Sequence, residues 1–351
     1  MRLPRRRFLS LCALALPLAA VGSGASADSA APATAAAATL GAAPAEPPIK
    51  QLRITVLSTM LAGNLQKGIG EWGFAALVEV DGRRLLFDTG QRPNTVRDNA
   101  RELGVELADI TDIVLSHHHG DHVGGLLTLR RALAETRPAA LAHTHVARGA
   151  FTSRGPADKG GDENPLIGIR TAYEAAGIGG KFTEHAGPVE LLPGVWFTGP
   201  IPRPHAGEQP VPPGWVLRAA DGTLVPDTTP EDAALVFDTP RGLVVLMGCG
   251  HAGLVNTLEY ARVITRRPSA PIYAVTGGFH LASASDASFS WTAERLRALG
   301  VRHIHGAHCS GLEAVYRLRR LLDLPREAAS VAAVGSWFDL AGGIEPLVLA
   351  R

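Results

Sequence analysis

Four histidines and an aspartate lie within six positions of the stretch IVLSHHHGDHVGGL, residues 113–126. Imidazole nitrogens and carboxylate oxygens are ligands that zinc, manganese and iron bind in proteins. Because the stretch begins as an apolar strand, the chain must turn where the histidines start. Such a turn can direct His117 and His119 to one point, and Asp121 and His122 to a second point nearby. We therefore expect a site for two divalent metal ions, with zinc as the first choice and manganese or iron as alternatives.

The other residues of this histidine turn also have expected roles. His118, in the middle of the cluster, is expected to point away from the metal ions. Gly120 is expected to relieve the turn, and Gly124 and Gly125 to permit close approach of another backbone segment. Two metal ions about 3.5–4 Å apart can share a hydroxide and stabilise both the attacking and the leaving oxygen of a hydrolysed bond.

Two of the three cysteines, Cys249 and Cys309, lie beside histidines in the glycine-rich stretches GCGH and HCSG, whereas Cys12 lies near the N-terminus. In an oxidising compartment Cys249 and Cys309 could form a disulfide. Their histidine neighbours favour a metal site instead. Both alternatives stay open at this point.

Strand-like and helix-like runs alternate from residue 50 onward. Strands are expected at residues 52–59, 74–90, 112–117, 232–248, 271–280, 303–308 and 331–337, the second and fourth being hairpins. Helices are expected at residues 95–104, 123–135, 254–267, 289–300 and 312–322. Both halves run from paired strands into strand–helix alternation, which favours an α/β fold, an αββα sandwich of two packed mixed sheets with helices on the outer faces. Between the halves, residues 150–231 show weak periodicity, and residues 200–215 are expected to form a loop.

The histidine turn resembles the HxHxDH signature of the metallo-β-lactamase superfamily, and LLFDTG, residues 85–90, resembles the strand before it. The likeness covers residues 50–340. The stretches EWGFAALVEVDGRRLLFDTG, VLMGCGHAGLVNTL, AVTGGFHL and HCSG further resemble the branch of 7,8-dihydropterin-6-methyl-4-(β-D-ribofuranosyl)-aminobenzene-5′-phosphate synthase-like proteins. The resemblance implies one domain of the metallo-β-lactamase fold over residues 50–351.

The resemblance also implies a role for each residue of the turn. His117 and His119 would bind one metal ion, and Asp121 and His122 the other. Asp121 would in addition take part in catalysis. Asp88 would support the turn by hydrogen bonds and would not bind metal.

Later strand ends must supply the remaining ligands. His251 in GCGH and His308 in AHCSG each follow an apolar strand. The aspartate that usually bridges the two metal ions in this family has no obvious counterpart, and Cys249 or a hydroxide alone could replace it. His280 in GGFH is either a ligand or a catalytic neighbour that polarises the substrate.

Histidines elsewhere in the chain are weaker candidates for catalytic or metal-binding roles. His143 and His145 have ligand-like spacing, but the resemblance gives them no role, and a structural role is expected. His205 lies in the proline-rich loop and is a candidate to approach the substrate. His303 and His305 alternate along a strand and are expected to pack.

Residues 1–27 are expected to form a signal peptide. Four arginines precede an apolar run, Leu9–Val21, and the sequence ASA at Ala25–Ala27 fits a cleavage site. The apolar run is too short to span a bilayer comfortably, although an uncleaved anchor is the alternative. The sequence RRRFL resembles the signal read by the twin-arginine export machinery, which exports folded proteins. We therefore expect a periplasmic or secreted protein, without stable membrane insertion after cleavage.

The composition of the rest of the chain limits its partners. Residues 28–49 are rich in alanine, proline and threonine and are expected to form a disordered linker. Removal of residues 1–27 takes away four arginines and no acidic residue, so the formal net charge falls from +1 to −3. With no remaining basic run and 5% aromatic residues, nucleic-acid binding is not expected. A small-molecule substrate is expected, and the sequence does not indicate an oligomeric state.

These observations favour an exported hydrolase in which a metal-bound hydroxide attacks an ester, lactone, amide or phosphoester. The branch resemblance favours a transferase that condenses a dihydropterin with a phosphoribosyl donor, but such donors are cytoplasmic metabolites. A non-catalytic metal-binding module is a third alternative, which the intact histidine turn disfavours. No serine–histidine pairing in a nucleophile-elbow context is present, so no covalent acyl-enzyme is expected.

Overall fold

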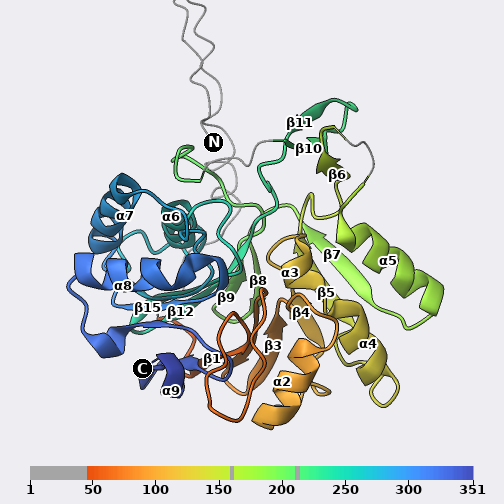
Figure 1. Cartoon of the computed structure of the whole chain (residues 1–351), viewed down its shortest axis with the longest axis horizontal. Coiled ribbons are helices and arrows are strands. Elements are labelled where there is room, and N and C mark those ends of the chain that lie inside the picture. Colours follow the sequence, from red (N-terminus) through yellow and green to blue (C-terminus); the bar gives the residue numbers. More distant parts are fainter. Residues whose placement is uncertain (1–45, 159–161, 210–213, 351) are drawn as a thin grey trace, which may run out of the picture.

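The computed structural model describes residues 46–158, 162–209 and 214–350 (Figure 1). The expected signal peptide, residues 1–27, and most of the expected linker lie outside the described residues. Among the described helices, none is both long and apolar enough to cross a membrane. The linker boundary needs one correction, because Ile49 is fully buried in the core between the two large sheets. Its backbone N–H donates to the carbonyl of Asp238 at 3.4 Å, so the folded domain begins before residue 50.

Two large mixed sheets form the centre of the molecule. The first contains eight strands in the spatial order β18 (Gly343–Glu345), β17 (Trp337–Asp339), β1 (Leu52–Ser58), β2 (Ala75–Val80), β3 (Arg83–Phe87), β4 (Asp112–Val114), β5 (His143–Ala147) and β7 (Lys181–His185). The second contains seven strands in the order β16 (Ala329–Val331), β15 (His303–Gly306), β14 (Ile272–Gly277), β13 (Gly242–Met247), β12 (Ala234–Thr239), β9 (Val195–Phe197) and β8 (Val189–Leu192).

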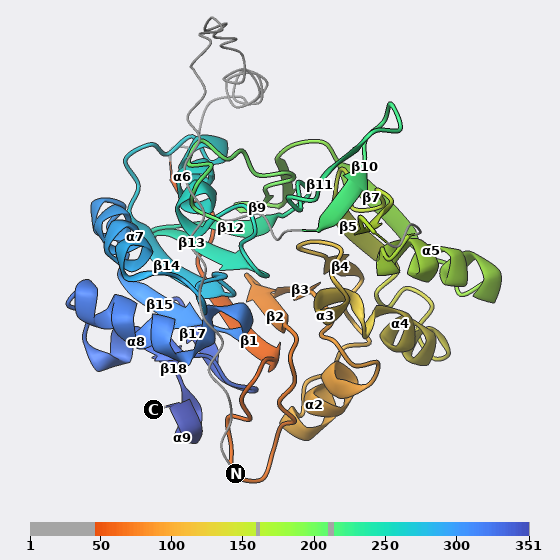
Figure 2. The same cartoon turned by 45° about the horizontal axis from the view of Figure 1, so that its top comes forward.

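Helices cover the outer face of each sheet, and the inner faces share one apolar core that includes Phe74, Phe87 and Phe237 (Figures 1 and 2). The helices over the first sheet are α2 (Thr95–Leu103), α3 (Gly120–Val123), α4 (Leu126–Ala134) and α5 (Pro165–Ala176). Those over the second are α6 (Leu254–Ile264), α7 (Asp286–Ala298) and α8 (Gly311–Leu321), while α9 (Leu347–Ala350) lies at the C-terminal end. The predicted αββα sandwich is confirmed.

The segment that showed weak periodicity, residues 150–231, is more regular than predicted. It contains α5, the strands β7 to β9, and a small third sheet in the order β11 (Leu224–Pro226), β10 (Trp215–Arg218) and β6 (Arg154–Pro156). The boundaries of α5 were encoded in the sequence: the Asn164 side chain accepts a hydrogen bond from the Leu166 N–H at 3.0 Å, and Gly177 ends the helix with a φ of 60°. The described part of the predicted loop, residues 200–209 and 214–215, has no helix or strand except at Trp215, which begins β10.

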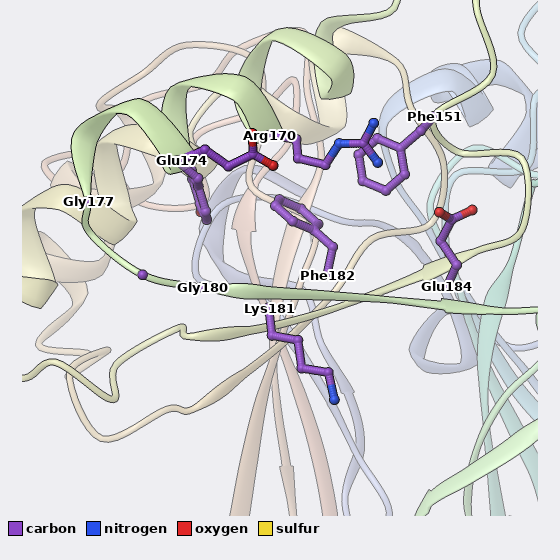
Figure 3. Close-up of a pocket in the computed structure, with 10 residues that line it drawn as sticks. Phe151, Arg170, Glu174, Gly177, Gly180, Lys181, Phe182 and Glu184 are labelled. Carbon is purple, nitrogen blue, oxygen red and sulfur yellow. The ribbon is translucent and has the colours of Figure 1, made fainter.

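A cavity of about 580 Å³ lies between α5 and the edge strand β7 (Figure 3). Phe182 and Glu184 of β7 point toward α5, whereas Lys181 points away from it (Figure 3). Side chains of a strand alternate between its two faces, so Thr183 and His185 share the face of Lys181. None of the predicted site residues lines this cavity.

Parallel pairing brings the predicted site residues to one edge of the sandwich. β3 pairs in parallel with β4, and β13 with β14, which in turn pairs in parallel with β15. The carboxyl ends of parallel strands lie at the same edge of a sheet, where loops can carry a site. Asp88 follows β3, His117 follows β4, Cys249 follows β13, His280 follows β14 and His308 follows β15.

The glycines beside the histidine turn differ in how tightly they pack. A Cβ atom at Gly124 would lie 1.8 Å from the Gln91 carbonyl oxygen, which confirms the predicted close approach. Gly120 was expected to relieve the turn. However, it is the first residue of α3, lies outside the left-handed region, and has no atom within 4 Å of its Cβ position. The turn therefore does not require glycine at position 120.

We predict that Gly124→Ala lowers the free energy of unfolding by at least about 1–3 kcal/mol, because a methyl group there must displace backbone. The matched variant Gly120→Ala should leave that free energy unchanged or raise it by about 0.5–1 kcal/mol, because alanine is the better helix former. Urea unfolding of both variants measures the difference. Equal stabilities of the two variants would contradict the close packing of Gly124.

Candidate metal centre

Three imidazoles meet where β4 and β13 end. His117 and His119 come from the turn after β4, and His251 comes from the turn after β13. Nε2 of His117 lies 2.9 Å from Nδ1 of His119. One nitrogen from each of the three rings lies within 4.8 Å of the other two. These nitrogens, here called the first group, could hold one metal ion.

A second group of three ligand atoms lies beside the first. Asp121 and His122 belong to α3, and His308 begins the short helix η1 (His308–Ser310) after β15. Oδ2 of Asp121 lies 3.2 Å from Nε2 of His308, and Nε2 of His122 lies 3.3 Å from the same nitrogen. All three donors are within 4.8 Å of one another, so this second group could hold another metal ion.

Cys249 lies close to both groups of ligand atoms. Its Sγ lies 3.3 Å from Nε2 of His122 and forms a further close set with His117 and His122. It therefore lies within 4.8 Å of one member of each group. Cys309 is the neighbouring thiol, and its Sγ donates to the carbonyl of Cys249 at 3.3 Å. Both thiols are free in the structure, which does not adopt the alternative of a disulfide.

The protonation and bonding of these imidazoles fit a metal. Burial lowers the pKa of His117 and His251 well below its usual value, and lowers that of His119 to about 3. Neutral imidazole is the form that binds a cation. Among the described residues, buried Nε2 of His251 and buried Nδ1 of His308 have no hydrogen-bond partner. Because buried polar atoms are normally paired, the unpaired nitrogen of His251 indicates that this donor faces a ligand, whereas the unpaired nitrogen of His308 is not the one that lies beside Asp121 and His122.

Asp88 stabilises the histidine turn by hydrogen bonds. Its Oδ1 accepts a hydrogen bond from the Ser116 backbone N–H at 2.7 Å, and its Oδ2 lies 2.7 Å from Nδ1 of His122. Burial disfavours a charged His122, but the carboxylates of Asp88 and Asp121 outweigh burial and raise the pKa of His122 to about 9. With Nδ1 held by Asp88, Nε2 of His122 is directed toward the second group.

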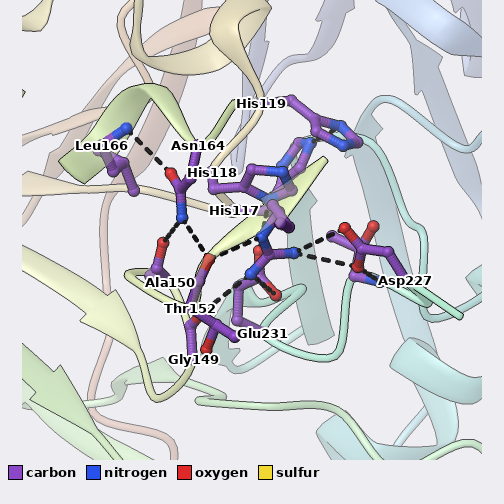
Figure 4. Close-up of polar contacts among 12 residues, drawn as sticks. His117, His118, His119, Gly149, Ala150, Thr152, Asn164, Leu166, Asp227 and Glu231 are labelled. Carbon is purple, nitrogen blue, oxygen red and sulfur yellow. Dashed lines mark hydrogen bonds and ion pairs between the residues drawn. The ribbon is translucent and has the colours of Figure 1, made fainter. Parts of the chain in front are cut away.

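His118 belongs to neither group of ligand atoms and instead joins a buried ionic network through Glu231 (Figure 4). Its Nδ1 lies 2.6 Å from Oε1 of Glu231, whose other carboxylate oxygen lies 3.2 Å from Arg154. Arg154 also donates to both carboxylate oxygens of Asp227 at 3.1 Å. Burial alone would raise the pKa of Glu231, but His118 and Arg154 lower it to about 2. The network thus connects the histidine turn to β6 of the small sheet.

A cavity of about 320 Å³ opens above the two groups. Cys249, His251 and His308 line it, and so do two indole rings, Trp72 and Trp215. Trp72 is 50% exposed, and its ring centroid lies 4.8 Å from that of His308. Trp215 is 38% exposed, so both rings border the solvent side of the cavity.

His280 lines this cavity and also a neighbouring cavity of about 820 Å³. Its backbone N–H donates to Sγ of Cys309 at 3.3 Å, and its buried Nδ1 has no hydrogen-bond partner among the described residues. His205, the histidine of the proline-rich loop, and Trp291 line the larger cavity. Nε2 of His205 is 3.0 Å from Glu259, which fixes its ring.

Sequence reasoning missed four residues around the centre. Trp72 lies three positions before the first residue of β2, and its position near a predicted strand end was a usable signal. Trp215, Arg154 and Glu231 lie in the segment of weak periodicity and carried no such signal. A fully buried arginine cannot be told from a surface arginine by residue type.

Comparison with known proteins agrees with this geometry. The family model described as "Metallo-beta-lactamase superfamily" matches residues 73–264. The 7,8-dihydropterin-6-methyl-4-(beta-D-ribofuranosyl)-aminobenzene-5′-phosphate synthase of Methanocaldococcus jannaschii is 27% identical over 76% of this chain and 90% of its own length. An uncharacterised protein of the same organism is 28% identical over 73% of this chain and 90% of its own length.

One solved structure is similar in both sequence and fold. Tm1679, described as a metal-dependent hydrolase of the β-lactamase superfamily, is 27% identical, with a TM-score of 0.58, over 77% of this chain and 93% of its own. The family model itself spans more than half of the chain and contains the whole histidine turn. The chain therefore belongs to the metallo-β-lactamase superfamily.

Proposed function

We propose that this chain is a metal-dependent hydrolase that cleaves an ester, lactone, amide or phosphoester of a small molecule. One observation carries the proposal: two groups of three ligand atoms lie side by side with Cys249 close to both, and two members of each group line one cavity together with Cys249. Two divalent ions, zinc being the ion that this donor set suits, would supply a water of lowered pKa and polarise the bond to be cleaved. His117, His119 and His251 would hold one ion.

The second group, Asp121, His122 and His308, would hold the other ion, with Cys249 in place of a bridging carboxylate. A thiolate is a soft ligand that suits zinc, and Sγ of Cys249 already lies 3.3 Å from His122. Asp88 would keep the His122 ring in the orientation in which Nε2 can bind. Each residue of the centre thus has either a ligand role or an orienting role.

His280 is proposed to act on the substrate. It lines both cavities, and its buried Nδ1 has no hydrogen-bond partner among the described residues. Trp72 and Trp215 offer aromatic faces at the mouth of the inner cavity. The two cavities, about 320 and 820 Å³, suit a small molecule with a reacting group in the inner one and the remainder in the outer one.

A second candidate function is a synthase reaction like that named for the archaeal relative. The similarity covers 90% of that relative's length, although the identity is 27%. Tm1679, a protein described as a hydrolase, is also 27% identical, so identity alone does not decide between the two reactions. The geometry favours the hydrolase because the donors converge on a centre that can activate water.

We predict that His117→Ala and His122→Ala each lose about one equivalent of metal and at least about 100-fold in turnover. Changing residues that only orient ligands costs about 10–100-fold, and removing a ligand should cost more. Metal content is measured on the purified protein by mass spectrometry. Turnover is measured on a panel of phosphodiesters, lactones and β-lactams.

The matched control is His303→Gln, since His303 is a partly buried strand histidine outside both groups. This variant should keep its metal content and turnover. Full metal content in His117→Ala and His122→Ala would contradict the assignment of ligands. Product from a dihydropterin and a phosphoribosyl donor, with no hydrolysis of the panel, would favour the synthase.

A third prediction separates the two roles of His280. His280→Gln should keep the full metal content and lower kcat by about 10²–10⁴-fold, the range for loss of a general acid or base. Loss of one metal equivalent would show instead that His280 is a ligand together with Cys249 and Cys309, with which it forms a close set.

The proposed location is periplasmic or secreted, and it rests on the N-terminal sequence alone. Arg5→Lys combined with Arg6→Lys should retain the precursor inside the cell, because the twin-arginine pair is the feature that the export machinery reads. Fractionation with immunoblotting measures the precursor and the mature form. The double substitution keeps the positive charge, so unchanged export would contradict this route while leaving export by another route open.

A further inference from the structure

A second cluster of metal-ligating side chains lies outside the centre described above. It consists of Asp112, His143 and His145, with His185 beside them, here called the strand-start cluster. One ligand atom from each of Asp112, His143 and His145 lies within 4.8 Å of the other two. Neither the histidine turn nor the proposed reaction uses any of these residues.

Strand pairing explains why these residues meet. Asp112 is the first residue of β4 and is the register partner of His143, the first residue of β5. His143 and His145 are two positions apart on one strand, so they share a face. His185 ends β7 and shares its face with Lys181, which points away from α5 (Figure 3). Asp112 and His143 therefore mark the amino ends of β4 and β5, and His145 lies two positions further along β5, whereas the histidine turn follows the carboxyl end of β4.

The donor atoms have the spacing that a metal requires. Oδ1 of Asp112 lies 3.0 Å from Nε2 of His145 and 3.3 Å from Nδ1 of His143. Two ligands of a tetrahedral zinc ion, each at about 2.0–2.1 Å, are about 3.3–3.4 Å apart. These two distances therefore need to change by only a few tenths of an ångström to admit zinc, and the ligand nitrogens of His143 and His145 lie within 4.8 Å of each other.

Neighbouring groups hold two of these donors in orientation. The hydroxyl of Thr111 donates to Oδ2 of Asp112, which leaves Oδ1 facing the two histidines. Nδ1 of His145 lies 3.0 Å from Nε2 of His185, and this contact directs Nε2 of His145 toward Asp112. Histidines that bind metal usually donate their other nitrogen in this way.

The cluster is also accessible. The side chain of His143 is 42% exposed and that of Asp112 is 28% exposed, so an ion can enter from solvent and keep a water as a fourth ligand. From this geometry we infer that Asp112, His143 and His145 form a third zinc site, separate from the hydrolytic centre, with His185 orienting His145. Zinc bound there would connect β4 to β5 and, through His185, to the edge strand β7.

The test uses Zn²⁺ alone with the purified protein. The double variant His143→Gln, His145→Gln should bind about one equivalent of Zn²⁺ less than the unmodified protein at saturation, with unchanged hydrolase turnover. His303→Gln is the matched control and should bind the same amount as the unmodified protein. Equal Zn²⁺ content in the double variant would overturn the inference and would leave the cluster as a hydrogen-bonded contact between strands.

A second measurement locates the ion and does not depend on turnover. Zn²⁺ should protect His143 from modification by diethylpyrocarbonate, followed by peptide mass spectrometry, and Asp112→Asn should remove that protection. If the double variant does not fold, Asp112→Asn also serves for the Zn²⁺ count, since its side chain is nearly the same size. No protection of His143, or loss of turnover together with the zinc equivalent, would contradict a separate site.

Discussion

The carboxylate of Asp88 orients both groups of the metal centre. Its Oδ2 lies 2.7 Å from His122 and accepts from the Ser116 hydroxyl at 2.7 Å, and that hydroxyl oxygen lies 2.8 Å from Nδ1 of His117. His117 belongs to the first group and His122 to the second, so one buried side chain sets their relative position. Asp88 has a φ of 56°, a strained conformation for an aspartate, which the surrounding hydrogen bonds maintain. Gly248 completes this arrangement, because a Cβ atom there would lie 2.0 Å from Oγ of Ser116, and only glycine lets Cys249 reach the centre.

Buried ion pairs, more than apolar packing, attach the small third sheet to the metal centre. Arg154 of β6 is 2% exposed and pairs with Asp227 and Glu231, and Glu231 in turn contacts His118. Removing one partner of a buried ion pair leaves an unpaired charge, which costs about 3–5 kcal/mol. The network therefore keeps β10, and with it Trp215, beside the cavity. Buried ion pairs can therefore fix the position of a segment whose apolar periodicity is weak.

Local patterns in the sequence were enough to predict much of the fold. Apolar alternation and the Asp81-Gly82 pair gave the β2–β3 hairpin, where both residues have positive φ, and periodicity gave α2 and α6 within a few residues. The turn containing His117 was sufficient to predict the family, and the structure brings Asp121, His122, His251 and His308 together with it. These residues follow strand ends, where an apolar run and a polar residue adjoin in sequence.

The residues that were not predicted depend on contacts between segments far apart in the chain. Arg154 and Glu231 are 77 positions apart and meet only because β6 folds back toward the end of β4. The strand-start cluster shows the same dependence, since the spacing of His143 and His145 was visible but their register with Asp112 was not. The two ends of β4 also differ in burial: His117 is 1% exposed, whereas the side chain of His143 at the other edge is 42% exposed. Because the cost of removing a cation from water rises with burial, a cation would exchange with solvent more freely at the exposed edge than at the buried donors of the candidate metal centre. The two ends of β4 thus lie in different environments, and the burial of each end determines what the histidines beside it can bind.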